Sequence, residues 1–166
     1  MEYSLLNQMA LASGTDKSEN WHNYTSIYYR YFGPIRHRQL KFLEIGVYRG
    51  ASVKMWESYF PNAELHFIDV TDEYLTYRSS RSKYHFFDQS NEQKMQEFAM
   101  EIGVKFDIIV DDGGHGNNQI IKSFEVCQIH IAFVTWYTTN RRGRISADEY
   151  APFFRRSMFS AFKEKI

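Results

Sequence analysis

Short apolar runs that end in an acidic residue or a glycine alternate along this chain with segments whose apolar residues recur at helical spacing. The strand-like runs are residues 40–45, 64–68, 84–87 and 104–110. The helical segments that precede and separate them are residues 5–10, 24–32, 50–60 and 95–102. Such alternation predicts right-handed crossovers and a mostly parallel sheet that helices cover on both faces. The sequence therefore predicts a doubly wound α/β fold.

Glycine and proline mark where the helices are expected to end. These expected ends are Gly14, Gly33-Pro34, Pro61 and Gly103. The spacing of Ser90 and Gln93 is that of a capping box, which predicts that the helix before Gly103 begins at Ser90. One more helix is indicated by the apolar residues Ile120, Ile121, Phe124 and Cys127. Residues 129–137 have the composition of a fifth strand.

Composition and charge exclude several classes of protein. With 166 residues, 43% of them apolar and 17% aromatic, the chain can bury the core of one domain. Its 20 basic and 20 acidic side chains balance, which argues against nucleic acid or an anionic membrane as a partner. Cys127, the single cysteine, cannot form an internal disulfide. Because the sequence also shows no basic leader and no membrane-spanning apolar stretch, we expect a cytoplasmic globular protein.

The stretch beyond Asn140 is basic, with seven Lys and Arg side chains against three acidic ones. This excess indicates a solvated helix surface in preference to a site for a polyanion. The 29 aromatic side chains leave room for an exposed apolar patch, so a homo-oligomer stays open as a partner.

Acidic side chains or glycines follow every expected strand. They are Glu44 with Gly46, Asp69, Asp88, and Asp111 with Asp112. Since ligands of open parallel sheets bind outside the carboxyl ends of the strands, we expect these groups to share one crevice. Acids placed there can accept hydrogen bonds from ribose hydroxyls or an amino group, or can hold a metal ion. The sequence therefore predicts a binding site at this edge of the sheet.

The turn after the first expected strand runs from Glu44 to Gly50 and lacks the G-x-G-x-x-G spacing of dinucleotide-binding loops. Tyr48 and Arg49 fill its middle, and Glu44 is unfavourable beside a diphosphate. The turn thus favours a ligand with an amino group and no phosphates, which argues against an NAD-dependent oxidoreductase. Asp69 lies 23 residues after Gly46, close to the offset of about 20 for a ribose-binding acid.

Each of these residues also has a purely structural interpretation. The glycines at 46 and 50 could serve only to turn a strand into a helix, and Asp69 could cap a helix. Asp88 could cap the helix that follows it, and Asp111 with Asp112 could cap a turn at a strand end. His115, which follows Asp111 and Asp112 in the same loop, could be a loop histidine without a catalytic role.

Six runs stand in a fixed order between residues 11 and 126, three quarters of the chain. They are Gly14-Thr15-Asp16-Lys17 with His22-x-Tyr24, Phe42–Val47, Gly50–Trp56, Tyr59–Ala63, Asp88–Ser90 and Phe106–His115. In this order they resemble the motifs of S-adenosylmethionine-dependent O-methyltransferases that act on macrolide sugars, of the mycinamicin and macrocin type. The resemblance implies a Rossmann-like methyltransferase fold and O-methylation of a small-molecule hydroxyl, such as that of a sugar or glycoside.

The resemblance also implies which residues surround the cofactor S-adenosylmethionine. They are Thr15, Tyr24, Glu44, Gly46, Gly50, Asp69, Asp88, Gln89 and Asp111. Glu44, Gly46 and the turn to Gly50 would hold the methionine part. Thr15 and Tyr24 would help to cover the cofactor carboxylate.

For the nucleoside, the resemblance assigns the ribose hydroxyls to Asp69 and the adenine to Asp88 and Gln89. Asp112 resembles a position that binds a divalent metal, usually Mg²⁺, which would lower the pKa of the acceptor hydroxyl. His115 resembles the general base that removes the proton of that hydroxyl, a task suited to an imidazole.

The last forty residues depart from the family's pattern. In the family a fifth strand ends in Glu-Asp and completes the metal site, whereas here Trp136 and Tyr137 stand in those places. We therefore expect a shortened or diverged C-terminal part in residues 128–166, after a lead-in and cofactor lid (1–36) and an α/β core (37–127) of the same domain. A catalytically impaired cofactor-binding or interaction protein of the same fold remains the alternative.

Overall fold

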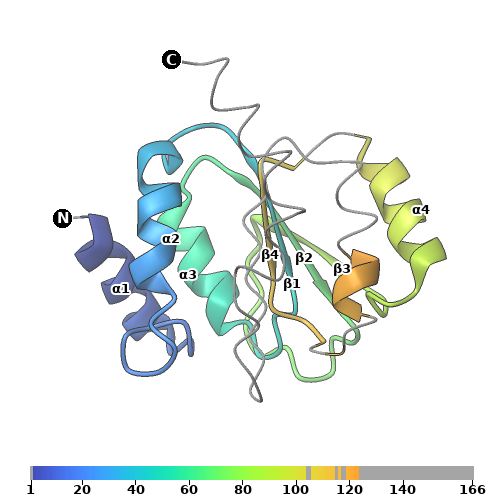
Figure 1. Ribbon diagram of the computed structural model, residues 1–166, viewed down its shortest axis with the longest axis horizontal. Coiled ribbons are helices and arrows are strands. Elements are labelled where there is room, and N and C mark those ends of the chain that lie inside the picture. The colour runs from blue at the N-terminus through green and yellow to red at the C-terminus, as the bar shows by residue number, and fades with distance from the viewer. Residues whose placement is uncertain (1, 104–105, 115, 117–118, 124–166) are drawn as a thin grey trace.

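Four parallel strands form one sheet in this computed structural model (Figure 1). They are β1 (Lys41–Ile45), β2 (Glu64–Asp69), β3 (Ser82–Phe86) and β4 (Ile108–Asp111), and they lie in the order β3-β2-β1-β4. The structure describes residues 2–103, 106–114, 116 and 119–123.

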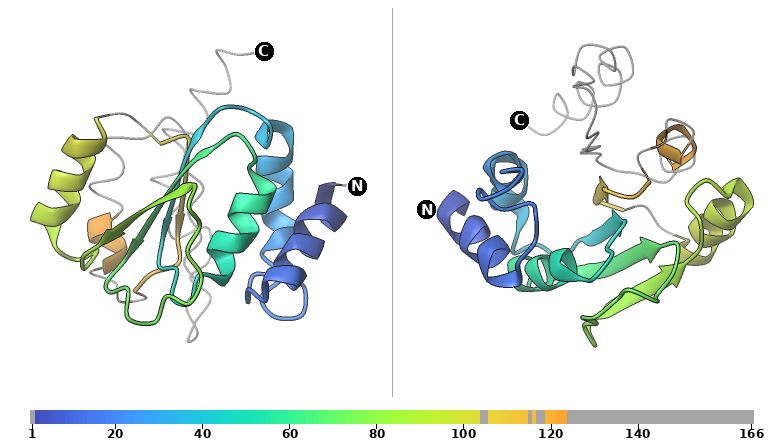
Figure 2. Two further views of the ribbon diagram at one scale, coloured as in Figure 1. Left: turned by 180° about the vertical axis from the view of Figure 1, so that it is seen from behind. Right: turned by 90° about the horizontal axis from the view of Figure 1, so that it is seen from below.

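Helices cover both faces of this sheet (Figure 2). One face carries α1 (Glu2–Ser13), α2 (Thr25–Phe32) with the 3-10 turn Gly33–Ile35, and α3 (Ala51–Tyr59). The other face carries α4 (Glu92–Ile102). The doubly wound α/β fold predicted from the sequence is thus confirmed. Over the described part of the chain, no helix has the length and apolar character needed to cross a membrane.

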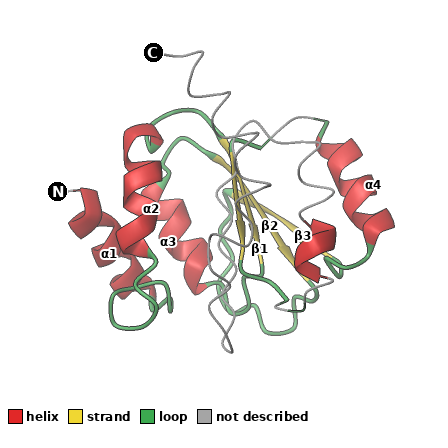
Figure 3. Ribbon diagram, in the orientation of Figure 1, coloured by secondary structure: helices red, strands yellow, loops and turns green. Residues whose placement is uncertain are grey.

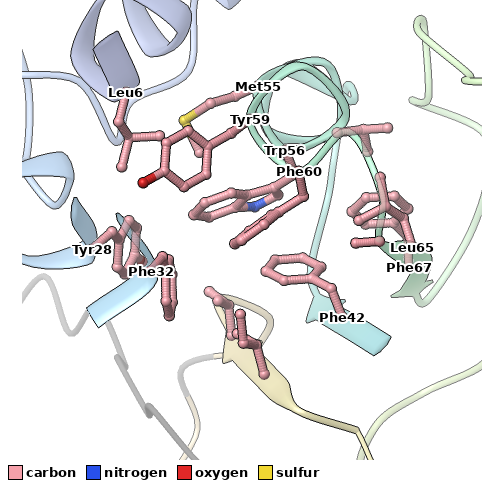
Figure 4. Packing of buried hydrophobic residues seen from close by; sticks show 14 of the residues in the cluster. Leu6, Tyr28, Phe32, Phe42, Met55, Trp56, Tyr59, Phe60, Leu65 and Phe67 are labelled. Atoms are coloured by element: carbon pink, nitrogen blue, oxygen red, sulfur yellow. The ribbon is translucent and has the colours of Figure 1, made fainter. Parts of the chain in front are cut away.

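Alternation along β1 divides the core into two clusters. Phe42 points to the face of α1–α3, whereas Leu43 and Ile45 point to the face of α4. The ring of Trp56 in α3 lies 5.0 Å from that of Phe42, and Phe60 completes this aromatic contact at 5.3 Å (Figure 4). Burial of each such side chain stabilises the fold by roughly 1.5–3 kcal/mol, so this cluster fixes α3 on the sheet.

Three local predictions differ from the structure: the start of α4, the bounds of the third strand, and the start of the fourth strand, which was expected before Phe106 but begins at Ile108. The helix α4 is capped by Asn91 and not by a capping box at Ser90: the Asn91 side chain accepts a hydrogen bond from the backbone N–H of Lys94 at 3.1 Å. Ser90 instead donates its backbone N–H and its hydroxyl to Asp88. The third strand begins two residues before the expected Tyr84 and ends one residue before the expected Phe87, because its half-exposed face shows a weaker apolar pattern than the buried strands.

Several predictions lie outside the described residues. They concern residues 104–105 of the expected fourth strand, the helix residues Phe124 and Cys127, the strand at 129–137, and the C-terminal segment from 128 onwards. Residues 119–123 are helical, in agreement with the expected start of that last helix.

The strand order reverses between β1 and β4. From β1 the chain moves outward to β2 and β3, and then returns to the other side of β1 with β4. Ile45 pairs with Ile68 on one side and with Asp111 on the other, so these three strands end at the same level. In open α/β sheets, ligands bind at a reversal of this kind, outside the carboxyl ends of the strands.

Candidate functional site

The carboxyl ends of the strands and the loop between α1 and α2 lie at the same end of the molecule (Figure 3). Backbone hydrogen bonds fix the first residues beyond the strands: Gly46 donates to Ile68 at 2.8 Å, and Asp112 donates to Ile45 at 2.8 Å. The residues after β1, β2 and β4 are therefore held as one unit. This edge of the sheet is the candidate site.

A buried lysine joins two of the expected site residues. The Lys17 ammonium forms an ion pair with the carboxylate of Asp112, and its Nζ lies 3.4 Å from Oε1 of Glu44. The Lys17 side chain is 3% exposed and that of Glu44 is 0% exposed. Burial alone would lower the pKa of Lys17, but the carboxylates of Glu44 and Asp112 outweigh it and raise that pKa. Lys17 is therefore a charged group enclosed by its two partners.

Glu44 is held from a second side by helix α3. The hydroxyl of Ser52, in the first turn of that helix, donates a hydrogen bond to Glu44 Oε2 at 2.7 Å. Burial raises the pKa of Glu44, and the hydrogen bond from Ser52 and the charge of Lys17 oppose that rise. A carboxylate without such partners would be costly at a fully buried position.

The loop that carries Lys17 is held in place by helix α1. Asn7 Oδ1 accepts hydrogen bonds from the backbone N–H of Glu19 at 3.0 Å and from the Thr25 hydroxyl at 3.2 Å. The Lys17 carbonyl accepts a further bond from the backbone of Thr25. Thr15, also assigned to the cofactor, is buried in this loop. The lead-in thus reaches the strand ends through a well-bonded loop.

Asp69 organises the turn that follows β1. Its Oδ2 accepts the backbone N–H groups of Val47 and Tyr48, each at 2.8 Å, and its Oδ1 accepts that of Val70 at 2.7 Å. Hydrogen bonds of this kind to a carboxylate are about twice as strong as neutral ones. The carboxylate expected to bind a ribose therefore also fixes the shape of the first turn.

Glycine is required in this turn for two reasons. Gly46 and Gly50 both have φ of +85°, which side chains rarely adopt. A Cβ on Gly46 would lie 2.3 Å from the carbonyl oxygen of Asp112, and one on Gly50 would lie 2.4 Å from that of Tyr77. The two glycines therefore allow other segments to approach the turn closely.

A second polar cluster ties the end of β4 to the turn before α4. Gln89 Nε2 lies 3.4 Å from both oxygens of Asp111 and 3.3 Å from the Ser123 hydroxyl, while its Oε1 accepts the backbone N–H of Gly114 at 2.7 Å. Ser123 donates to Asp111 at 2.6 Å. Burial raises the pKa of Asp111, although the hydrogen bonds from Ser123 and Gln89 act to lower it. Gln89 and Asp111, which were expected to line the cofactor site, thus bind each other.

Among the remaining expected site residues, Asp88 and Tyr24 have other hydrogen-bond or ring partners. Asp88 is exposed, and the backbone and hydroxyl hydrogen bonds from Ser90 lower its pKa. Tyr24 stands at the N-terminus of α2, where its ring stacks on that of His22 at 5.2 Å. His115, the expected general base, lies outside the described residues.

The described residues do not fit a magnesium ion at Asp112 in this arrangement. Mg²⁺ requires a near-octahedral set of oxygen donors, and the Asp112 carboxylate is already paired with an ammonium group. Nowhere in the described ranges do three or more His, Cys, Asp or Glu side chains gather as metal ligands could. The assignment of a metal to Asp112 stays a prediction.

Sequence reasoning missed three residues of this site. Lys17 belongs to one of the runs that carried the family resemblance, yet nothing in the pattern predicts a buried ammonium. Ser52 also belongs to one of those runs, Gly50–Trp56, without any signal for its partner, and Ser123 has no sequence signal beyond its place in an expected helix. Their roles depend on contacts with carboxylates from other segments, at 2.7 and 2.6 Å.

Together, the parallel sheet, its two helical layers and its polar carboxyl edge define a Rossmann-like methyltransferase fold. The chain superposes on MycE methyltransferase from the mycinamycin biosynthetic pathway, in complex with Mg and SAH, with a TM-score of 0.69 and 30% identity. That match covers 76% of this chain and 34% of the other. No protein-family model matches the sequence.

Two curated relatives extend this comparison. L-olivosyl-oleandolide 3-O-methyltransferase of Streptomyces antibioticus is 34% identical over 134 residues, which cover 76% of this chain and 34% of the relative. The 8-demethyl-8-alpha-L-rhamnosyl tetracenomycin-C 2'-O-methyltransferase of Streptomyces olivaceus is 33% identical over 125 residues, 70% of this chain and 32% of the relative. The chain is therefore homologous to macrolide and sugar O-methyltransferases, as the sequence motifs predicted. It spans about a third of the length of the curated relatives it matches.

Proposed function

We propose that this chain binds S-adenosylmethionine at the carboxyl edge of the sheet and takes part in methyl transfer to a hydroxyl of a small-molecule glycoside. The observation that carries the proposal is the convergence of Glu44, Asp69 and Asp112 on the strand reversal, in a chain homologous to O-methyltransferases. S-adenosylmethionine, when bound, supplies a sulfonium methyl that is already activated for transfer.

The residues present fit such a ligand at the first turn. Gly46 and Gly50 let the backbone of Asp112 and Tyr77 pack closely on that turn, and Asp69 holds the backbone N–H groups of the turn in place. A turn fixed before the ligand arrives holds donor and acceptor atoms in line at a lower entropic cost. The chain's contribution to methyl transfer would thus be positioning.

Proton removal from the acceptor is assigned to His115. A neutral imidazole beside the acceptor hydroxyl could take its proton as the oxygen attacks the methyl group. This role rests on the resemblance of the run Phe106–His115 to the family motif. Replacement of His115 by Ala should abolish turnover while S-adenosylhomocysteine still binds.

Calorimetric titration with S-adenosylhomocysteine tests the proposal. We expect Asp69→Ala to weaken binding by about 10–100-fold, because it removes a charged acceptor that contacts the turn and would contact the ribose. Asp72→Ala is the matched control: Asp72 is an exposed acid three residues further on, paired with Arg78. Equal affinities for all three proteins, or no binding by the wild type, would contradict the proposal.

A cofactor-binding protein without turnover is the second candidate function. It is favoured by Trp136 and Tyr137, which occupy the places of two acids in the family. Methylation of candidate glycosides that depends on His115 would exclude it. A cytoplasmic location, a homo-oligomer and the division into residues 1–36, 37–127 and 128–166 stay predictions.

A further inference from the structure

Lys17 occupies a charge environment that resembles a cation site. Its ammonium lies between two carboxylates that come from different strands, Glu44 in β1 and Asp112 after β4. A third carboxylate, that of the preceding residue Asp16, has its Oδ1 3.9 Å from the Lys17 Nζ and is half exposed. Two acids held so close together repel one another unless a positive charge separates them.

We infer that Lys17 is the resident cation of this site: its ammonium takes the place beside Asp112 that a divalent metal would take, and Lys17 and a metal exclude each other there. The inference rests on the proposed function only in placing the cofactor at the same edge of the sheet. It assigns a positioning role to Lys17 and makes cofactor binding by this chain independent of added metal.

The contacts of Lys17 explain why the exclusion is expected. A metal bound to Asp112 would lie within a few ångströms of the ammonium, and two cations so close in a buried site repel strongly. The ammonium has no easy exit, because its side chain is 3% exposed and its loop is fixed by Asn7 of α1. An ammonium supplies charge without the octahedral donor set that Mg²⁺ needs.

Manganese serves as the probe, because free Mn²⁺ has an electron paramagnetic resonance signal that decreases when the ion binds. We expect the Mn²⁺ signal to be the same in the presence of the wild-type protein as in the presence of Asp112→Asn, because neither should bind the ion at this site. In Lys17→Met the acids Glu44 and Asp112 lose their shared counter-charge, so we expect Mn²⁺ affinity to rise at least about tenfold. The double variant Lys17→Met/Asp112→Asn should lose that gain.

Two controls keep this result interpretable. Lys54→Met removes a lysine on the exposed side of α3 and should leave Mn²⁺ binding at the wild-type level. Lys17→Gln retains a hydrogen-bond donor of similar reach, and serves as the neutral variant if Lys17→Met does not fold. Circular dichroism of each variant establishes that it is folded.

The inference is overturned if wild-type protein binds Mn²⁺ and Asp112→Asn abolishes that binding, since metal and Lys17 would then share the site. It is also overturned if neither folded neutral variant gains Mn²⁺ affinity. These titrations contain no cofactor, so their outcome does not depend on whether S-adenosylhomocysteine binds. Failure of the proposed function would appear only in the calorimetry with Asp69→Ala.

Discussion

Gly46 and Gly14 show how the same backbone conformation can have different consequences at two positions. Both have positive φ, +85° and +74°. A Cβ on Gly46 would lie 2.3 Å from the carbonyl oxygen of Asp112, whereas a Cβ on Gly14 would have no heavy atom of another segment within 4 Å. The first residue permits a close approach of two backbone segments, and the second only ends helix α1.

We therefore predict that Gly46→Ala lowers the free energy of unfolding by at least about 2–3 kcal/mol, since it adds a backbone clash to the strain of a left-handed alanine. Gly14→Ala should lose only about 1 kcal/mol, which is the strain alone. Urea denaturation of both variants measures the difference. Equal losses would mean that the turn can move away from Asp112.

At the scale of single residues, the sequence predicts positions better than it predicts partners. The acids at 44, 69 and 112 were expected at the strand ends because each follows an apolar run. The shared partner of Glu44 and Asp112 could not be predicted, because Lys17 reaches these two acids from a loop 27 residues or more away along the chain. An ion pair between such distant positions depends on how the elements pack.

Helix α4 illustrates the same limit at the scale of elements. Its existence and its apolar face followed from the spacing of Met95, Phe98 and Ala99, which are buried as expected. Its first residue did not, because Ser90 and Asn91 are both good caps and only local hydrogen bonding decides between them. Strong periodicity therefore defines an element better than it defines the ends of that element.

The cap of α4 gives a prediction at this scale. Asn91→Ala should lower the free energy of unfolding by about 1 kcal/mol, because the N–H of Lys94 loses its acceptor. Ser90→Ala removes only an exposed hydrogen bond to Asp88 and should cost less than half as much. Thermal or urea unfolding distinguishes the two, and a larger loss in Ser90→Ala would restore the capping box as the start of the helix.

At the scale of the whole molecule, a pair of histidines between the sheet and helix α4 makes the stability of the fold depend on pH. His66 in β2 is fully buried, and its Nδ1 lies 3.2 Å from Nε2 of His85 in β3. Burial and the neighbouring His66 lower the pKa of His85 to about 4, and burial also lowers the pKa of His66. The ring of Phe98 in α4 contacts that of His85 at 4.6 Å, so a charge here would enter the core between sheet and helix.

The sign of the pH effect follows from these directions. Unfolded histidine takes up a proton near pH 6.5, whereas His85 in the folded protein does so only near pH 4. Between these values the unfolded state binds more protons, and stability must fall as the pH falls from about 6.5 towards about 4. Glu64, whose pKa is lowered to about 2 chiefly by its hydrogen bond from Lys83, stays ionised over that range.

We predict that wild-type protein loses about 1 kcal/mol more than His85→Gln between about pH 7 and about pH 5, because the partial exposure of His85 keeps the difference below the roughly 2 kcal/mol that the two pKa values alone would give. Glutamine keeps a hydrogen-bonding group for His66 but does not titrate. His37→Gln, at an exposed histidine, should follow the wild type. Urea denaturation at the two pH values gives the difference, and because the acids are common to all three proteins, their titration cancels. If His85→Gln lost as much stability as the wild type, the pH dependence of stability would come from a group other than His85.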